Sequence, residues 1–390
     1  MQGRWLPTVS DLHSVAIASQ LVLFSSVVVL MSSLFRPNIQ AIAGYVPGEQ
    51  PRTDDWIKLN TNENPYPPSP KVIEAIQKAA TGRLNIYPDA SATCFREAAA
   101  DLFQVDSDWI LPANGSDENL TIIFRSFCDE GQTIAYPYPS YVLYETLAKI
   151  QNCHVQRLQL DANFQWSADD ATQMAAACRL ILVPNPNSPT GNRWSADQLA
   201  MLVPEQGVLV LDEAYGDFPE TPHRGQLLTE SRFAKRTIVT RTLSKSYSLA
   251  GLRFGFSIAD PELTSGMQKV KDSYNCDAIA IAAATAAILD QDWMLNNRRM
   301  IVETRKRLED ALASLGFEVS PSEANFLWVI HPSGEHQRIY EQLKARKILI
   351  RMMKFPHSNC LPEGLRISIG SDEEINKTIE ALQQIVKELN

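Results

Sequence analysis

Short apolar segments that alternate with helical patterns through the middle of the chain are the feature that most limits its possible folds. These segments are residues 109–111, 134–136, 180–183, 208–211 and 237–240. Their alternation with helical patterns is typical of strands in a parallel sheet that helices cover on both faces. The sequence therefore predicts an α/β fold of three layers, with a mostly parallel central sheet between two layers of helices.

The pattern changes after Asp260. Helical patterns cover roughly 261–315, short strands are predicted at 318–319, 326–330, 348–351 and 365–369, and a terminal helix is predicted at 371–389. We expect a large domain at residues 61–262, a smaller α+β domain at 263–390, and an N-terminal arm at 31–60 that joins the small domain.

Residues 1–30 differ in composition from the rest of the chain. The stretch from Val15 to Leu34 is apolar, but Gln20 and several serines make it a poor membrane span. It also lacks the strongly basic start of a signal peptide. We expect the functional chain to begin at Met31, with residues 1–30 as an extension outside the fold; a targeting segment or an anchor is the equal alternative.

Charge and cysteine content argue against several classes of function. The 390 residues carry a formal net charge of -9 and no stripe dense in lysine and arginine, which argues against nucleic acid as the main partner. The six cysteines are not paired at short spacing, so neither a disulfide framework nor a metal site is predicted. Such thiols are typical of a reducing compartment, and we expect a cytoplasmic protein without a membrane partner.

Polar residues follow the ends of several predicted strands. Ser116, Asn187, Ser188, Asp212 and Lys245 all stand in such positions. In parallel sheets of this kind the ligand lies beyond the carboxyl ends of the strands. We therefore expect these side chains to converge on one site.

The segment around Lys245 combines a lysine with residues that suit a phosphate. Lys245 lies among hydroxyl residues, between Thr242 and Arg253. A lysine amine can form a Schiff base, and hydroxyls with an arginine can hold a phosphate. The glycine turn before Ser116 would present backbone N–H groups to the same anion, although a well-capped helix is the alternative explanation. No P-loop, GxGxxG or HExxH motif occurs.

Eight motifs in this order resemble the fold-type-I pyridoxal-phosphate (PLP) aminotransferases and, within them, the histidinol-phosphate aminotransferase family. The motifs are residues 62–65, 87–89, 114–118, 139–141, 185–191, 212–215, 242–253 and 365–370. The resemblance extends from about Met31 to the C-terminus. It implies a homodimer that uses PLP for transamination between L-histidinol phosphate and 2-oxoglutarate or glutamate, in histidine biosynthesis.

The resemblance also implies a role for each site residue. Lys245 is similar to the Schiff-base lysine that later moves a proton, Asp212 to the carboxylate that keeps the pyridine nitrogen protonated, and Tyr215 to the donor to the ring oxygen. Tyr141 resembles the aromatic residue that stacks on the ring. The residues implied at the cofactor phosphate are Gly115, Ser116, Asp117, Thr242, Ser244 and Arg253, with Tyr87 reaching across from the partner subunit.

One position departs from the family pattern. The family has an asparagine directly before Pro-Thr-Gly, where it contacts the ring oxygen, and this chain has Ser188 there with Asn187 just before it. Either Asn187 takes that contact through a shifted turn or the Ser188 hydroxyl does, with Asn187 slightly preferred.

Arg366 occupies the place where aminotransferases bind the substrate carboxylate, and the resemblance implies that it meets the substrate phosphate here. Arg351, Tyr45 and Asn62 are its implied companions, although Arg351 could also be a surface charge at a strand end. The rival functions are an aromatic or other amino-acid aminotransferase and a lyase similar to threonine-phosphate decarboxylase. A third rival, a PLP-binding sensor in a regulator, would need a DNA-binding segment that residues 1–30 do not resemble.

Overall fold

The computed structural model describes residues 34–43, 48–53, 55–222, 226–230, 232–233, 235–361 and 363–389. The chain divides into two compact units, residues 1–45 and residues 46–390. In the first unit the described part contains one short helix, α2 (Pro37–Ala41). The expectations for residues 1–30 and for Tyr45 lie outside the described residues.

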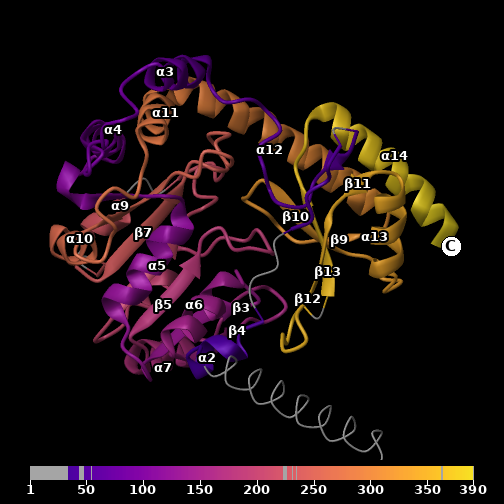
Figure 1. The fold of residues 1–390 in the computed structure, drawn as a ribbon. Coiled ribbons are helices and arrows are strands. Elements are labelled where there is room, and N and C mark those ends of the chain that lie inside the picture. Colours follow the sequence, from indigo (N-terminus) through magenta and orange to yellow (C-terminus); the bar gives the residue numbers. More distant parts are fainter. Residues whose placement is uncertain are drawn as a thin grey trace, which may run out of the picture. The chain divides into compact units, whose positions relative to one another are not determined.

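A seven-stranded sheet forms the centre of the second unit (Figure 1). Its strands are β2 (Ile110–Ala113), β3 (Thr133–Tyr138), β4 (His154–Gln159), β5 (Leu180–Pro184), β6 (Val208–Asp212), β7 (Thr237–Thr242) and β8 (Gly255–Ala259), in the order β2-β8-β7-β6-β5-β3-β4. Strands β4, β3, β5, β6 and β7 pair in parallel, whereas β8 runs antiparallel to both of its neighbours. The predicted mostly parallel sheet is thus confirmed.

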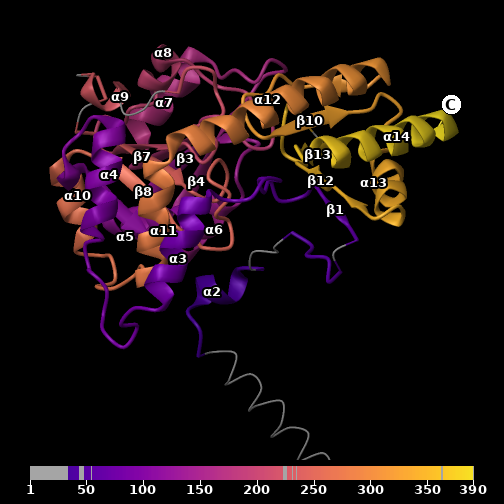
Figure 2. The same ribbon diagram turned by 90° about the horizontal axis from the view of Figure 1, so that it is seen from above.

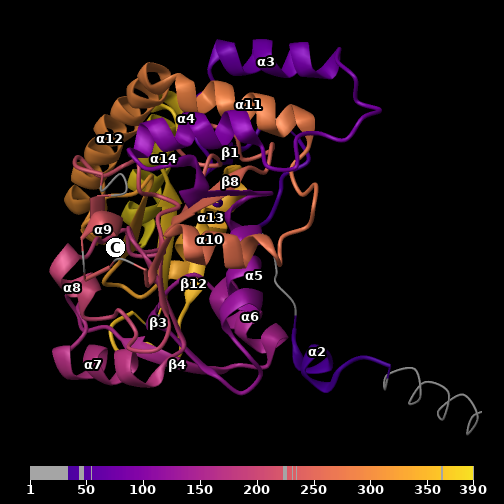
Figure 3. The ribbon, with the colours of Figure 1, turned by 90° about the vertical axis from the view of Figure 1, so that its left-hand side faces the viewer.

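Helices cover both faces of this sheet, as Figures 2 and 3 show from two directions. One face carries α5 (Ser116–Phe127) and α6 (Leu143–Gln151), and the other carries α7 (Ala168–Ala177), α8 (Ala196–Ala200) and α9 (Gln226–Thr229). The remaining helices of this part are α3 (Pro70–Ala80), α4 (Thr93–Phe103), α10 (Pro261–Gln268) and α11 (Ala278–Leu289), of which α11 packs against α3 and α4. The three predicted layers are therefore present.

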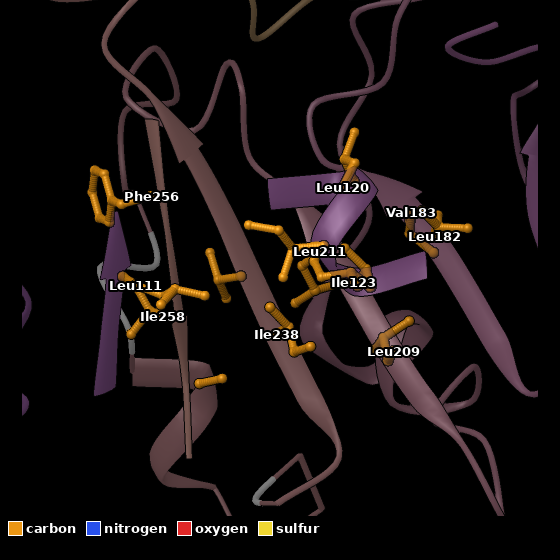
Figure 4. Close-up of a cluster of buried hydrophobic side chains, with 14 of the residues drawn as sticks. Leu111, Leu120, Ile123, Leu182, Val183, Leu209, Leu211, Ile238, Phe256 and Ile258 are labelled. Atoms are coloured by element: carbon orange, nitrogen blue, oxygen red, sulfur yellow. The ribbon is translucent and has the colours of Figure 1, made fainter. Parts of the chain in front are cut away.

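Burial on both faces explains the aliphatic composition of β5 and β6. Every residue of β5, β6 and β7 is buried. Figure 4 shows Leu120 and Ile123 of α5 in the same buried cluster as Leu211 and Ile238 of the sheet. A polar residue inside such a strand needs a partner, and Arg241 of β7 is buried in ion pairs with Glu213 and Asp217.

A smaller antiparallel sheet lies in the C-terminal part of the chain. Its order is β12-β13-β10-β9, and its strands are β9 (Glu318–Val319), β10 (Phe326–Ile330), β12 (Arg351–Lys354) and β13 (Glu363–Ser368). The helices α12 (Gln291–Ser314), α13 (His336–Ala345) and α14 (Asp372–Leu389) belong to the same part. This part therefore has the predicted α+β arrangement.

The predicted strand at 348–351 is two strands that meet different partners. Strand β11 (Ile348–Leu349) pairs in parallel with β1 (Ile57–Lys58), which belongs to the predicted arm. After Ile350 the chain continues as β12, which pairs with β13. Sequence periodicity does not show this change, because both halves are extended and only one residue, Ile350, separates them.

Helix α12 links two hydrophobic cores. Met294 packs in the cluster around the large sheet, together with residues of α11, and Ile301 packs in the cluster around the small sheet. We therefore propose a domain boundary inside α12, later than the residue 262 expected from the sequence.

Within the described residues, no single helix has the length and apolar character needed to cross a membrane. Helices α11 and α12 reach that length and apolar character only when they are taken together, and they are bent by 75° relative to each other.

Candidate active site

Asp212 is the last residue of β6 and is almost completely buried. Its Oδ2 accepts a hydrogen bond from the Tyr144 hydroxyl at 2.7 Å, and its Oδ1 accepts from the Ala214 N–H at 3.2 Å and from the Thr240 hydroxyl at 3.3 Å. Burial raises the pKa of Asp212 to about 6, because the charged form loses its hydration. The three hydrogen bonds favour the charged form and limit that rise.

Lys245 follows β7 and points its amine at the segment after β1. Nζ donates to the Thr61 carbonyl at 3.0 Å, and Asn64 Nδ2 donates to the Lys245 carbonyl at 3.1 Å. Burial, helped by the positive charges of Arg366 and Arg253, lowers the pKa of Lys245 to about 8, although Glu63 opposes this effect. A large share of this amine is therefore neutral at mildly alkaline pH, and a neutral amine is a nucleophile and a base.

A cradle of donors lies between the start of α5 and the segment after β7. Arg253 Nη1 donates to Ser244 Oγ at 3.2 Å, Thr242 Oγ1 donates to Ser244 Oγ at 3.0 Å, and Arg253 Nη2 lies 3.3 Å from Asp117 Oδ2. Helix α5 begins at Ser116 without a side-chain cap. An uncapped helix N-terminus beside hydroxyls and a guanidinium suits a phosphate.

Gly115 keeps this cradle open. It has φ of 86°, and a Cβ there would lie 2.7 Å from Arg253 Nη2. The positive φ favours glycine, and a side chain there would displace the Arg253 guanidinium. The residues present thus fit a phosphate-bearing cofactor.

The Tyr215 side chain connects the large sheet to the small one. Its hydroxyl accepts from Asn62 Nδ2 at 2.9 Å, and Asn62 Oδ1 accepts from the Ser368 hydroxyl of β13 at 2.8 Å. Burial raises the pKa of Tyr215, which keeps its phenol protonated and able to donate.

Tyr141 is half-buried in the loop before α6. Its hydroxyl donates to Asp117 Oδ1 at 3.2 Å, and its ring meets that of Tyr144 edge-on at 5.6 Å between centroids. These contacts hold the Tyr141 ring close to the start of α5.

The two candidates for the ring-oxygen contact have different surroundings. Asn187 is fully buried, and its amide is used by the segment after β3 and by its own turn: Oδ1 accepts from the Ser140 hydroxyl, and Nδ2 donates to the Pro139 carbonyl and to the Thr190 hydroxyl. The Ser188 hydroxyl instead accepts from Arg366 Nη1 at 3.1 Å and also bonds Tyr215. The geometry therefore favours Ser188 over the slightly preferred Asn187.

Arg366 and Arg351 are cross-strand partners in the antiparallel pair of β13 and β12. Residues directly opposite each other in such a pair project from the same face of the sheet. Arg366 Nη2 also donates to the Asn60 carbonyl at 3.0 Å, and its guanidinium lies over the Phe326 ring at 5.4 Å. Arg351 and Asn60 line a cavity of about 290 Å³. Arg351 and Arg366 therefore share one face of the small sheet, and Arg366 contacts Ser188.

Tyr87 lies apart from these residues within the chain. It is 77% exposed and stacks on Tyr274, with ring centroids 4.4 Å apart. No contact with the cradle is recorded for it within this chain's described residues.

Sequence reasoning missed Tyr144, which gives Asp212 its shortest hydrogen bond. No local signal marks it, because Tyr144 lies in the first turn of α6 and its partner Asp212 is 68 positions away. It also missed Asn64, whose amide holds the carbonyls of Lys245 and Ser246.

Comparison with known proteins identifies the family of this chain. The family model for class I and II aminotransferases matches residues 54–382. The chain is 47% identical over 359 residues to the histidinol-phosphate aminotransferase of Rhodopirellula baltica, covering 91% of this chain and 97% of that protein. It is 43% identical to the histidinol-phosphate aminotransferase of Geobacter sulfurreducens, covering 90% of this chain and 99% of that protein.

A solved structure agrees as well. The histidinol-phosphate aminotransferase of Sinorhizobium meliloti, in complex with pyridoxal-5'-phosphate, superposes with a TM-score of 0.82 at 25% identity and covers 92% of this chain and 99% of that one. The fold, the cradle and the sequence matches lead to one conclusion: the chain belongs to the class I and II aminotransferase family.

Proposed function

We propose that this chain is a PLP-dependent enzyme that moves an amino group between L-histidinol phosphate and 2-oxoglutarate, with glutamate as the other amine partner. The observation that carries the substrate choice is the pair of arginines, Arg351 and Arg366, on one face of the small sheet. Two guanidinium groups match several phosphate oxygens better than a single carboxylate. The similarity to histidinol-phosphate aminotransferases over most of the chain supports the same choice.

The described residues supply a place for each part of the cofactor. When bound, PLP supplies an electrophilic carbon for an incoming amine and an electron-withdrawing ring. We propose that Asp212 pairs with the ring nitrogen, that Ser188 and Tyr215 contact the ring oxygen, and that Tyr141 packs on the ring. The proposed phosphate ligands are Gly115, Ser116 and Asp117 through their N–H groups, and Thr242, Ser244 and Arg253 through their side chains.

Lys245 is proposed to move the proton in this reaction. Its Nζ has a pKa lowered to about 8, so the amine exchanges protons readily at mildly alkaline pH. The neutral Nζ can accept the proton that leaves the amine-bearing carbon of the substrate and can then return it. The Thr61 carbonyl, which accepts from Nζ at 3.0 Å, holds the amine in place between these events.

A second copy of this chain is the proposed partner. Leu84, Ile86 and Tyr87 are about half exposed or more and follow one another in the connection between α3 and α4, which projects from the helices in Figure 3. Exposed apolar residues in one segment are typical of an interface. We propose a homodimer in which Tyr87 reaches the phosphate cradle of the partner. The free cysteines are compatible with the cytoplasm, which we propose as the location.

The test is a single-turnover measurement with the purified protein loaded with PLP. We expect histidinol phosphate to convert the cofactor to its amine form, with kcat/KM above that of histidinol by several orders of magnitude, about 10³-fold or more. Arg366→Ala should remove most of that preference and leave cofactor binding intact. Arg338→Ala, at an exposed position of α13, is the control that should change nothing.

Two outcomes would overturn the substrate proposal. One is equal use of histidinol and its phosphate, and the other is faster turnover of phenylalanine than of either, which would identify an aromatic aminotransferase. Release of carbon dioxide from a phosphorylated amino acid in place of amine transfer would identify a lyase.

A further inference from the structure

Tyr144 is a buried tyrosine that the proposed reaction does not yet use. It lies in α6 with no exposed surface, and its hydroxyl donates to Asp212 Oδ2 at 2.7 Å. Its ring contacts those of Tyr141 and Tyr136, with centroids at 5.6 and 5.9 Å. The side chain is thus held on both sides and its hydroxyl is aimed at one carboxylate oxygen.

The two oxygens of Asp212 have different partners. Oδ1 accepts two longer hydrogen bonds, from the Ala214 N–H and the Thr240 hydroxyl, whereas Oδ2 accepts the short one from Tyr144. A carboxylate has about four acceptor positions. The three recorded donors therefore leave about one position for the ring nitrogen of a cofactor.

We propose that Tyr144 is a positioning residue that orients the Asp212 carboxylate and favours its ionised form, so that the ring nitrogen of bound PLP stays protonated. The proposal rests on the proposed function, because it concerns the partner of the cofactor ring.

The chemistry of the phenol supports this role. Burial and the nearby Asp212 charge raise the pKa of Tyr144, so its hydroxyl keeps its proton and acts only as a donor here. A donor to a carboxylate stabilises the charged form, and Tyr144 opposes the rise that burial imposes on the pKa of Asp212.

The other groups that face Asp212 cannot replace this donor. Asp117 of α5 carries a like charge that raises the pKa of Asp212 further. Thr240 of β7 and the Ala214 N–H reach only Oδ1. Tyr215, in the segment after β6, bonds Asn62 and Ser188. Among these groups, only the Tyr144 hydroxyl of α6 donates a hydrogen bond to Oδ2.

The test compares Tyr144→Phe with Tyr136→Phe. Tyr136 is a matched control, because it is also a buried tyrosine whose hydroxyl donates to a carboxylate, in its case that of Glu145 at 2.8 Å. Both variants lose one oxygen and keep the ring, and thermal melting checks that both fold. The first readout is the NMR resonance of the isotope-labelled ring nitrogen of bound PLP, and the second is the pH dependence of the dissociation constant for PLP.

Without the Tyr144 hydroxyl the carboxylate becomes more basic, so the shared proton moves from the ring nitrogen toward Asp212. We expect the ring-nitrogen resonance of Tyr144→Phe to shift toward that of neutral pyridine. We also expect its loss of PLP affinity on acidification to begin about one pH unit higher than in the wild type. Tyr136→Phe should match the wild type in both readouts.

An unshifted resonance and an unchanged affinity profile in Tyr144→Phe would overturn the proposal. Equal shifts in both variants would also overturn it, because they would indicate general loosening. A wild-type protein that binds no PLP would refute the proposed function itself, and this result is distinct from the other two.

Discussion

At the scale of single residues, burial brings the pKa values of an acid, Asp212, and a base, Lys245, closer together. It raises the pKa of Asp212 to about 6 and lowers that of Lys245 to about 8, in both cases because the charged form is poorly solvated. Both groups come to titrate within about two pH units of neutrality. Perturbed groups in one cleft are typical of a catalytic site.

The first prediction concerns the amine of Lys245. Only its neutral form attacks an aldehyde, so the rate at which the apoprotein captures PLP should rise with pH and level off above a midpoint near 8. Stopped-flow absorbance measures this profile. Lys245→Arg should show no covalent capture at any pH, and a wild-type midpoint near 10.5, the ordinary lysine value, would contradict the prediction.

The second prediction concerns Asp212→Asn. A carboxyl whose pKa is raised in the folded state binds its proton more tightly there than in the unfolded chain. Stability is therefore lost as pH rises from 3.8, the unfolded value, through about 6. The difference between these two pKa values corresponds to a total of about 3 kcal/mol of unfolding free energy. Between about pH 4.5 and about pH 7.5, the wild-type apoprotein should lose about 2 kcal/mol more unfolding free energy than the variant.

Urea denaturation at the two pH values measures this difference. Asp310→Asn, at an exposed position of α12, is the control that should behave as the wild type. In the PLP-loaded form, Asp212→Asn should still bind the cofactor and lose turnover by about 10²-fold or more. Parallel pH profiles of the wild type and Asp212→Asn would mean that the buried carboxyl does not titrate in this window.

At the scale of elements, the cradle depends on two segments that approach closely. The start of α5 meets the end of β7 and the start of β8, and a Cβ at Gly255 would lie 2.4 Å from the Ser116 nitrogen. The helix N-terminus can lie against the sheet here only because a side chain is missing. The phosphate site is therefore a property of packing between elements as well as of the residues in it.

The third prediction tests this packing with two glycines of positive φ. Gly115→Ala and Gly131→Ala both place a side chain at φ of 86° and 79°, and each should lower stability by about 1 kcal/mol. Only the Cβ at Gly115 meets Arg253, whereas that at Gly131 has nothing within 4 Å. We expect weaker PLP binding, by about 10-fold or more, in Gly115→Ala alone. Fluorescence titration with PLP measures the affinity, and equal losses in the two variants would refute the specific role of the cradle.

At the scale of the whole molecule, the exposed segment before α4 points to a second subunit. The fourth prediction is that the protein sediments as a dimer and that Leu84→Asp combined with Ile86→Asp makes it a monomer with little activity. Placing two charges in an apolar interface is costly because they lose their hydration. Leu295→Asp, a change at a partly exposed leucine of α12, should leave the dimer intact. A fully active monomer would exclude a contribution of Tyr87 to the partner's site.

Local pattern was enough to predict much of this protein. Apolar runs bounded by polar residues predicted five of the seven strands of the large sheet, but not β4 or β8. The motif order predicted the family that the comparisons confirm. The positions of Asp212 and Lys245 after strand ends follow from the same rule, because parallel strands bring their carboxyl ends to one edge. These features depend on neighbours in sequence, which a single chain displays directly.

Only the tertiary structure decided which side chains meet. Tyr144 reaches Asp212 from 68 positions away, and Arg366 reaches Ser188 from 178 positions away. The split of the predicted strand at Ile350, the hydrogen bonds of Asn187 to Ser140 and Pro139 and the two pKa shifts all depend on partners or burial supplied by distant segments. Hydrogen bonding and desolvation act through space, so a local pattern in the sequence does not contain them.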